Sequence, residues 1–435
     1  MKEIISHLYQ DKSDGHWVIQ SNEEHTAGVA ERASRFANEF GMTSWGRLLG
    51  LLHDKGKESN AFQQHIRKES GYAPETKVTS DYHHAYVGGI IARKLYGKSF
   101  DNFLTNQIVS HHTGLHDSDE LDQNLCKDIP GEIDACVDKI QLNHLTTKIA
   151  PNDFHHLARM LYSCLVDADF LDTEAFMDKE SSALRKNKAN LATLLPMLEK
   201  HLKNLKKDTK DTEVNRIRNQ VQEQCSKMSE GSIGFYSLTV PTGGGKTLSS
   251  LLWAMKHAIH NRQKRIIVAI PYTSIIMQTA AILRSIFGEE NVLEHHSNVD
   301  PEAIKDERLN EKMKLATENW DYPIIVTTNV QLFESMFSNK PSKCRKLHNI
   351  VNCIIILDEV QTLPVDYLQP IVDSLKTYNK LFNVSVLFTT ASQPVLCGAI
   401  EGCNPKATFK GIDKVTEIIP LDFKLHDKLR RVKLE

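Results

Sequence analysis

The sequence has 435 residues, which at about 150 residues per domain favours two or three domains, each long enough to bury a core. Its 53 basic and 55 acidic side chains leave a net charge of −2, so a polyanion must bind to a local patch rather than to a globally positive surface. The composition, 40% hydrophobic and 25% charged, excludes bulk disorder. The sequence has neither an apolar run of about 18 residues nor a signal-peptide core, and its eight cysteines form no Cys-x-x-Cys pair. We therefore expect a soluble, cytoplasmic protein that does not associate with a membrane.

The first part of the chain, residues 1–180, is predicted to be an all-α domain. Apolar residues recur with the helical period in five segments, 24–40, 44–53, 83–96, 103–112 and 153–170. Almost no segment there has the pattern of a strand. Thirteen of the 20 histidines lie within residues 1–170. Because neutral imidazole is the commonest metal-ligand side chain, this distribution indicates a metal site.

The candidate metal ligands lie in or at the ends of these predicted helices, so that several helices can bring them together in a bundle interior. In chain order they are His25, His53, Asp54, His84, His111, His112 and Asp169. The doublet His53-Asp54 offers a terminal ligand and a carboxylate able to bridge two cations, which predicts a binuclear site. Mixed imidazole and carboxylate ligands suit Mn, Fe, Co, Ni or Zn better than Mg, which prefers oxygen ligands.

Two of these positions have a neighbour of the same type. His83 and His84 cannot both face one stripe of a helix, and Asp167 and Asp169 lie about 200° apart around one. We favour His84, which Gly88 follows one turn later, and Asp169, but both choices stay open. The other histidines of this part are interpreted as ordinary surface or core residues: His7, His16, His65, His116, His144, His155 and His156.

A basic helical connector is predicted over residues 181–230. Between Leu184 and Arg218 there are ten Lys and Arg residues against four Asp and Glu residues. A solvated helix face is the main interpretation of this charge run, and a contact with nucleic acid is the alternative.

The remaining part, residues 231–425, is predicted to be an α/β domain with a parallel sheet. Five short apolar runs, rich in Val and Ile, are typical of strands buried on both faces: 234–240, 265–270, 323–328, 353–359 and 384–390. Helical patterns over 247–260 and 273–287 separate the first of them, which favours βαβ units.

A phosphate-binding loop follows the first of these strands. The candidate nucleotide-binding residues are Thr242, Gly243, Gly244, Gly245, Lys246 and Thr247. Glycines let backbone N–H groups close on phosphate oxygens, and the following helix adds partial positive charge at its N-terminus. Lys246 is expected to reach the β- and γ-phosphates of ATP, and the Thr247 hydroxyl to bind Mg²⁺.

Two carboxylates end the strand at 353–359, where its carboxyl edge meets a ligand crevice. Asp358 is expected to hold Mg²⁺, and Glu359 to act as a catalytic residue that polarises the attacking water.

These motifs resemble those of superfamily 2 helicases, in the same order. The loop 241–247 resembles motif I, residues 270–280 motif Ia, and Asp358-Glu359-Val360-Gln361 motif II. Thr390 and Ser392 correspond to motif III, which couples ATP to strand binding, although the hydroxyl residues stand in inverted order. Thr327 and Thr328 resemble a DNA-contacting motif, and ordinary β-propensity explains them almost as well. The resemblance implies a RecA-like lobe, with residues 426–435 starting a linker to a second lobe that lies outside these 435 residues.

The N-terminal part resembles the HD phosphohydrolase superfamily. His53-Asp54-Lys55-Gly56-Lys57, the extra pair His111-His112 and a following helicase lobe together resemble the HD nuclease–helicases of type I CRISPR systems. This resemblance implies one metal held by His25, His53, Asp54 and Asp169, and a second held by Asp54, His84, His111 and His112. Lys57 is expected to neutralise a phosphate, although a solvent-exposed lysine is nearly as good an interpretation.

The resemblance further implies an HD-type endo- or exonuclease that degrades the single-stranded DNA of invaders. ATP-driven translocation would feed the strand, and the Cascade surveillance complex would recruit the enzyme. Two alternatives remain. One is an HD nucleotide phosphohydrolase with an NTP-binding domain, and the other is a catalytically silent, ATP-gated module that docks on Cascade.

Overall fold

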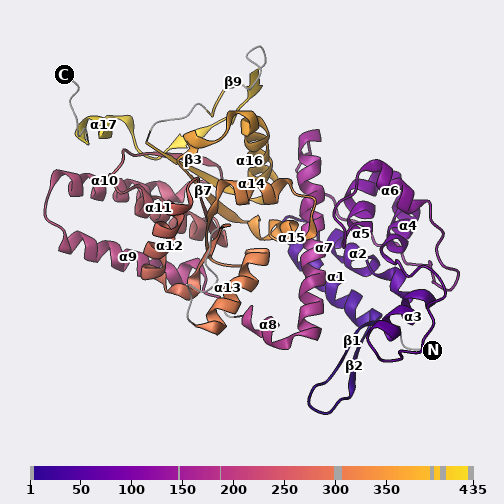
Figure 1. Cartoon of the computed structure of the whole chain (residues 1–435). Coiled ribbons are helices and arrows are strands. Elements are labelled where there is room, and N and C mark those ends of the chain that lie inside the picture. The colour runs from indigo at the N-terminus through magenta and orange to yellow at the C-terminus, as the bar shows by residue number, and fades with distance from the viewer. Residues whose placement is uncertain are drawn as a thin grey trace. The chain divides into compact units, whose positions relative to one another are not determined.

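The computed structural model describes residues 4–145, 147–186, 188–297, 306–391, 396–401 and 408–429 (Figure 1). The chain divides into two compact units. The first comprises residues 1–186 together with Ser335–His348, and the second comprises Asn187–Glu334 and Asn349–Glu435. The first unit therefore takes a short segment from the middle of the sequence of the second.

The first unit is mainly helical. Its helices are α1 (Asn22–Asn38), α2 (Thr43–Leu52), α3 (Asn60–Glu69), α4 (Ala85–Tyr96), α5 (Asn106–Val109), α6 (Ser118–Leu125), α7 (Phe154–Met177), α8 (Lys179–Leu184) and α15 (Pro341–Cys344). Ser21 caps α1: its hydroxyl accepts a hydrogen bond from the backbone N–H of Glu24, whose side chain returns to the N–H of Ser21. The segment predicted as one helix over 103–112 is instead a π-helical turn, Asp101–Thr105, followed by the short α5.

A β-hairpin precedes these helices, which corrects the prediction of a purely helical domain. Strand β1 (Ile5–Gln10) pairs antiparallel with β2 (Trp17–Ser21). The turn between them is closed by a backbone hydrogen bond from Gly15 N to Asp11 O, and Gly15 has a φ of +75°. The strands are short and interrupted by buried polar residues such as Ser6, so their hydrophobic period is too weak to see in the sequence.

The second unit contains a seven-stranded parallel sheet, which confirms the predicted α/β architecture. Its strands are β3 (Phe235–Thr239), β4 (Arg265–Ile270), β5 (Val292–His295), β6 (Ile324–Thr328), β7 (Cys353–Asp358), β8 (Ser385–Thr390) and β11 (Val415–Glu417). They lie in the order β11-β3-β8-β7-β4-β6-β5. All five predicted strands are present, whereas the short edge strands β5 and β11 were not predicted. A two-stranded ribbon of β9 (Ala399–Glu401) and β10 (Thr408–Lys410) lies outside this sheet.

Helices complete the second unit: α9 (Leu191–Asp208), α10 (Glu213–Lys227), α11 (Lys246–His260), α12 (Thr273–Phe287), α13 (Glu307–Asn319), α14 (Asn329–Phe337), α16 (Leu368–Phe382) and α17 (Leu425–Lys428). Helix α14 continues into the segment that belongs to the first unit. None of the helices in the described part of the chain is both long and apolar enough to cross a membrane.

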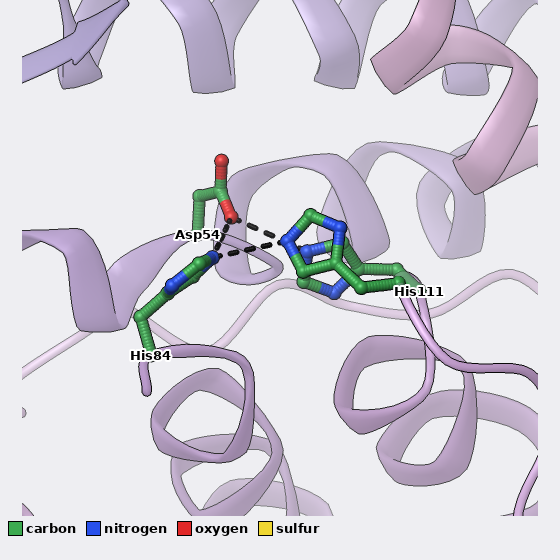
Figure 2. A group of neighbouring side chains, drawn as sticks. Asp54, His84 and His111 are labelled. Atoms are coloured by element: carbon green, nitrogen blue, oxygen red, sulfur yellow. Dashed lines mark hydrogen bonds and ion pairs between the residues drawn. The ribbon is translucent and has the colours of Figure 1, made fainter. Parts of the chain in front are cut away.

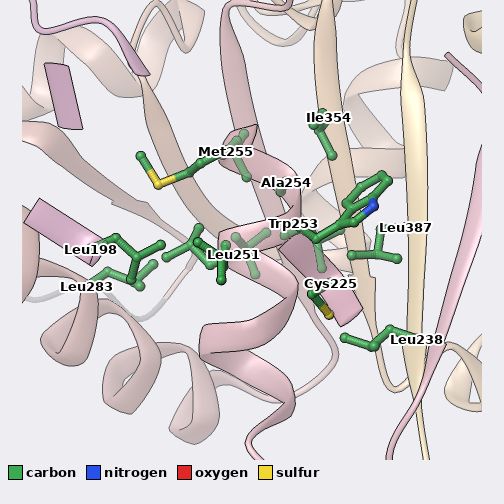
Figure 3. Close-up of a cluster of buried hydrophobic side chains, with 14 of the residues drawn as sticks. Leu198, Cys225, Leu238, Leu251, Trp253, Ala254, Met255, Leu283, Ile354 and Leu387 are labelled. Carbon is green, nitrogen blue, oxygen red and sulfur yellow. The ribbon is translucent and has the colours of Figure 1, made fainter. Parts of the chain in front are cut away.

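Of the residues predicted as a connector, 181–186 belong to the first unit, whereas the helices that follow contribute to the core of the second unit. Leu194, Leu198 and Leu202 on α9, with Val221 and Cys225 on α10, belong to the buried cluster around α11 and the sheet. Figure 3 shows Leu198 and Cys225 within this cluster. The lysines of α9 lie on its exposed face. An amphipathic helix with a charged outer face therefore accounts for the basic run.

Candidate metal centre and nucleotide site

Three histidines are held in one orientation by hydrogen bonds on their Nδ1 atoms. His53 Nδ1 lies 2.8 Å from the carbonyl oxygen of Gly50, and His111 Nδ1 lies 2.6 Å from that of Ile108. His25 Nδ1 lies 3.0 Å from Asp172 Oδ2. Because each Nδ1 is held by an oxygen, each ring directs Nε2 into the interior, which is how a metal-binding imidazole is usually oriented.

Asp54 lies at the centre of these rings, two residues after the end of α2. Its Oδ2 is 3.3 Å from both His25 Nε2 and His53 Nε2. Its Oδ1 is 3.3 Å from His84 Nε2 and 3.4 Å from His111 Nε2 (Figure 2). Each carboxylate oxygen thus faces its own pair of imidazoles.

The remaining candidate ligands close these two groups. Asp169 Oδ1 lies 3.3 Å from His25 Nε2, and His112 Nε2 lies 3.1 Å from His84 Nε2. The structure brings together all seven predicted ligands as two sets that share Asp54, each with its ligand atoms within 4.8 Å of one another: His25, His53, Asp54 and Asp169, and Asp54, His84, His111 and His112. A further group, Asp11, Asp14 and His16, lies on the exposed turn of the hairpin.

The donor set suits a pair of cations. His25 Nε2, His53 Nε2, His111 Nε2 and Asp54 Oδ1 are all buried, and no described residue forms a hydrogen bond of acceptable geometry with any of them. Leaving four such atoms unpaired in a protein interior costs free energy that a bound ion would recover. Nitrogen and carboxylate donors converging in this way fit Mn, Fe, Co, Ni or Zn.

The charges around Asp54 attract cations. Burial lowers the pKa of His25, but contacts with the carboxylates of Asp169, Asp172 and Asp54 outweigh burial and raise it to about 10. Burial also lowers the pKa of His53, but the carboxylates of Asp54 and Asp169 outweigh burial and raise this pKa to about 9. The pKa of Asp54 lies well below its usual value, against the effect of burial, because imidazoles and Lys57 surround it. The group is therefore an anionic pocket that favours positive charge.

The structure distinguishes the two pairs of alternatives. Asp169 faces the histidines, whereas Asp167 accepts a hydrogen bond from Arg345 Nε at 2.7 Å and lies 2.9 Å from His348 Nε2. His84 lies in the cluster, whereas the side chain of His83 is 73% exposed.

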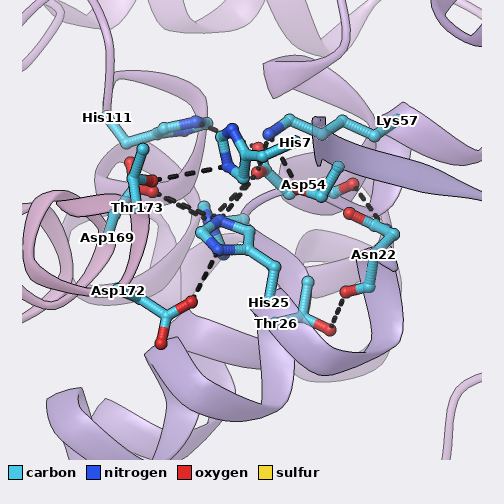
Figure 4. Close-up of polar contacts among 12 residues, drawn as sticks. His7, Asn22, His25, Thr26, Asp54, Lys57, His111, Asp169, Asp172 and Thr173 are labelled. Carbon is cyan, nitrogen blue, oxygen red and sulfur yellow. Dashed lines mark hydrogen bonds and ion pairs between the residues drawn. The ribbon is translucent and has the colours of Figure 1, made fainter. Parts of the chain in front are cut away.

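Three residues near the cluster have surroundings that the sequence did not reveal. Lys57 is buried, and its ammonium lies 2.7 Å from Asp54 Oδ2 and 3.1 Å from Ser6 Oγ, so it is no solvent-exposed lysine. His7 packs edge-on against His25, with ring centroids 4.7 Å apart, and burial lowers its pKa to about 3 (Figure 4). Asp172 orients His25. Only the spacing Asp169-x-x-Asp172, about one helical turn, could have pointed to the last of these.

The predicted phosphate loop runs from the end of β3 into α11. Gly243 and Gly245 have φ values of +87° and +84°, a conformation that favours glycine. A Cβ on Gly244 would lie 3.1 Å from Pro241 O and overlap the side chain of Val240. Arg218 Nε donates to the carbonyl oxygen of Gly243 at 2.9 Å. These contacts fix a tight turn whose following residue, Lys246, begins the helix.

The acidic strand end lies beside this loop. Lys246 Nζ is 3.2 Å from Asp358 Oδ1 and also contacts Glu359. Parallel pairing of β7 with β8 aligns Asp358 with Thr389, whose hydroxyl donates to Asp358 Oδ1 at 2.5 Å. A cleft is lined by Lys246, Thr247, Asp358 and Thr389 among others. Lysine, hydroxyl and carboxylate groups are the ones that ATP and its Mg²⁺ require.

The residues that resemble motif III and the DNA-contacting motif have different surroundings from one another. Thr390 Oγ1 donates to Gln361 Oε1 at 2.7 Å, which joins the ends of β8 and β7, while Ser392 lies outside the described residues. Thr327 is buried, and its hydroxyl donates to the carbonyl oxygen of His295 at 2.7 Å. Thr328 Oγ1 accepts a hydrogen bond from the N–H of Gln331. Thr389 was not predicted as a site residue, although it stands next to Thr390.

Comparison with known proteins first identifies the class of the second unit. The DEAD/DEAH box helicase family matches residues 219–396. Together with the seven-stranded parallel sheet, this match fits a RecA-like helicase lobe.

The chain is also similar to particular proteins of that class. It is 29% identical over 185 residues to the CRISPR-associated nuclease/helicase Cas3 of Haloferax volcanii, and the matched segment covers 38% of this chain and 20% of that protein. A putative Cas3 of Methanocaldococcus jannaschii is 34% identical over 138 residues, 29% of this chain and 18% of that protein. The crystal structure of T. fusca Cas3 with AMPPNP superimposes with a TM-score of 0.56 at 15% identity, over 89% of this chain and 50% of that chain.

The chain is thus Cas3-like in sequence and fold, which confirms the resemblance to CRISPR nuclease–helicases at this level. The matched segments span about a fifth of the curated relatives' length.

Proposed function

We propose that this chain is a metal-dependent nuclease for single-stranded DNA, joined to an ATP-binding helicase lobe. The observation that carries the proposal is the position of Asp54, which offers one oxygen to each of two pairs of imidazoles. Two divalent transition-metal cations held there would supply Lewis acids for the charge that develops on a phosphodiester during hydrolysis.

The chain's own residues set up this centre. Hydrogen bonds from their Nδ1 atoms fix the rings of His53 and His111, so that little reorganisation is needed when cations bind. The ammonium of Lys57, held against Asp54, offsets part of the carboxylate charge and limits the site's net charge when a phosphodiester approaches. In the helicase lobe, Lys246 and Thr247 would hold the phosphates and Mg²⁺ of ATP, with Asp358 and Glu359 beside them.

Similarity to Cas3 supports the biological setting of the proposal. The protein would degrade invader DNA in CRISPR interference, with translocation by the helicase feeding the strand and with Cascade as the recruiting partner. Efficient ATP hydrolysis would require a second RecA-like lobe to complete the nucleotide site.

The test is cleavage of circular single-stranded DNA with Mn²⁺ and without ATP. A circle has no ends, so contaminating exonucleases cannot cut it. Wild type should cut the circle, and Asp54→Ala should not. Asp14→Ala is the matched control, because Asp14 belongs to a His and Asp group that is exposed, and it should cut like wild type. Hydrolysis of deoxynucleoside triphosphates without DNA cleavage would favour the nucleotide phosphohydrolase, and binding to Cascade without either activity would favour the docking module.

A further inference from the structure

Three aromatic rings form a nearly parallel stack beside the candidate metal centre. The rings of His65 and Tyr82 lie face to face, with centroids 3.8 Å apart and planes 4° apart. The ring of His83 is parallel to that of Tyr82 within 7°, with centroids 5.4 Å apart. Tyr82 is 40% exposed, and His83 is more exposed still. The side chains of Tyr82 and His83 are thus both accessible to solvent.

One helix positions both this stack and a candidate metal ligand. Phe62 and His65 lie three residues apart on α3 and therefore on the same side of the helix. Phe62 packs edge-on against His84, with centroids 4.8 Å apart, while His65 packs on Tyr82. Because Tyr82 is only two residues from His84, their Cα atoms are at most about 7.6 Å apart. The exposed rings therefore belong to the two residues that immediately precede a candidate metal ligand, and the same helix packs on both.

We propose that His65, Tyr82 and His83 form a stacking platform for an unpaired nucleobase of single-stranded DNA, next to the phosphodiester at the metal centre. This inference rests on the nuclease function proposed above and names how its substrate is held. Every base has an aromatic face, so such a platform selects unpaired strands without selecting a sequence. A base within a duplex is already stacked on both faces, and it would have to leave the helix to use the platform.

The charges at the platform permit a phosphodiester to approach. Asp81 is the carboxylate nearest along the chain, and it makes a hydrogen bond with His83 Nδ1. The positive charge of Lys127 attracts the carboxylate of Asp81. The Lys127 ammonium also lies 4.8 Å from the centroid of the Tyr86 ring. These contacts offset the negative charge of Asp81 at the edge of the platform.

The first experiment measures stacking directly. Oligothymidylates that each carry one 2-aminopurine, at a different position in each strand, are bound to wild type, Tyr82→Ala and Tyr82→Phe. We expect fluorescence quenching at one position with wild type and Tyr82→Phe, and its loss with Tyr82→Ala. Tyr72→Ala is the matched control, because Tyr72 is 41% exposed but packs edge-on against Trp17, and it should quench like wild type.

The second experiment measures cleavage with Mn²⁺. Tyr82→Ala should raise KM about 5- to 150-fold with kcat unchanged, as expected when one base stack is lost. A strand with abasic sites should show the same rise in KM with wild type and no further rise with Tyr82→Ala.

Other outcomes separate the platform from its alternatives. If Tyr82→Ala weakens Mn²⁺ binding as much as it raises KM, the stack merely positions His84 and the proposal is overturned. Unchanged quenching and KM in Tyr82→Ala would overturn it as well. If wild type fails to cut DNA but shows quenching that depends on Tyr82, the platform stands and the nuclease proposal fails.

Discussion

Replacing Gly56 by alanine tests whether close backbone packing sets the geometry of the candidate metal centre. A Cβ on Gly56 would overlap the carbonyl oxygen of His84 and lie 2.7 Å from its carbonyl carbon and Cα. Carbon atoms in contact normally lie about 3.5–4.0 Å apart. The segment that follows Asp54 and the residue His84 must therefore separate by about 1 Å.

This separation should affect stability and function to different degrees. Overpacking of this kind costs about 1–3 kcal/mol of unfolding free energy. A misplacement of about 1 Å within a catalytic centre can lower the rate about 100-fold. We expect Gly56→Ala to remain folded, to bind the Mn²⁺ next to His84 more weakly in isothermal titration calorimetry, and to cut circular single-stranded DNA about 100-fold more slowly.

The control for this substitution is Gly131→Ala in the same unit. A Cβ on Gly131 has no described atom within 4 Å, and its φ is not positive, so stability, Mn²⁺ binding and cleavage should stay at wild-type levels. Gly56→Ala with wild-type Mn²⁺ affinity and cleavage rate would refute the argument that this contact fixes the distance between Asp54 and His84.

Three further predictions concern other parts of the molecule. Lys246→Ala removes an ammonium from the nucleotide cleft and should weaken binding of a fluorescent ATP analogue about tenfold, while metal-dependent DNA cleavage continues; unchanged affinity would argue against phosphate binding by Lys246. Burial lowers the pKa of His257 from 6.5 to about 4, so the unfolded chain binds this proton more readily between these pH values, and stability falls as the pH falls. The loss attributable to His257 is about 3 kcal/mol over this window, and His257→Gln should make urea-unfolding free energy less dependent on pH there; an equal slope in both proteins would contradict this. Asp167→Asn removes the charge that pairs with Arg345 and should cost about 3 kcal/mol in urea unfolding, whereas Asp14→Asn on the exposed hairpin turn should unfold like wild type.

Much of the second unit could be predicted because its signals are local. The limits of β4 match the predicted run, β6, β7 and β8 differ from theirs by one residue at one end, and β3 is one residue shorter at each end. A strand buried on both faces must be continuously apolar, and a glycine-rich loop between a strand and a helix is typical of phosphate binding. Strands β5 and β11 were missed because they are three or four residues long and lie at the edges of the sheet.

The family resemblance implied both the candidate metal ligands and their division into two groups that share Asp54, which the structure also brings together, but it gave no orientation for the side chains. The hydrophobic period of α7 could not distinguish Asp167 from Asp169, because both lie on this helix and both are largely buried away from solvent. The choice depends on Arg345, which follows Asp167 by 178 residues and which no pattern near Asp167 reveals. His7 was likewise missed because its strand shows no clear alternation.

The sequence by itself determined which chemical groups the protein carries and in what order: imidazoles and carboxylates at helix ends, then a phosphate loop and an acidic strand end. Tertiary structure alone decided which oxygen of Asp54 faces which pair of histidines, and that Gly56 lies against His84. It also decided that Ser335–His348 joins the first unit. The physical reason is that local patterns reflect the burial of a residue within its own helix or strand, whereas the direction in which a buried polar group points is set by partners far away in the chain.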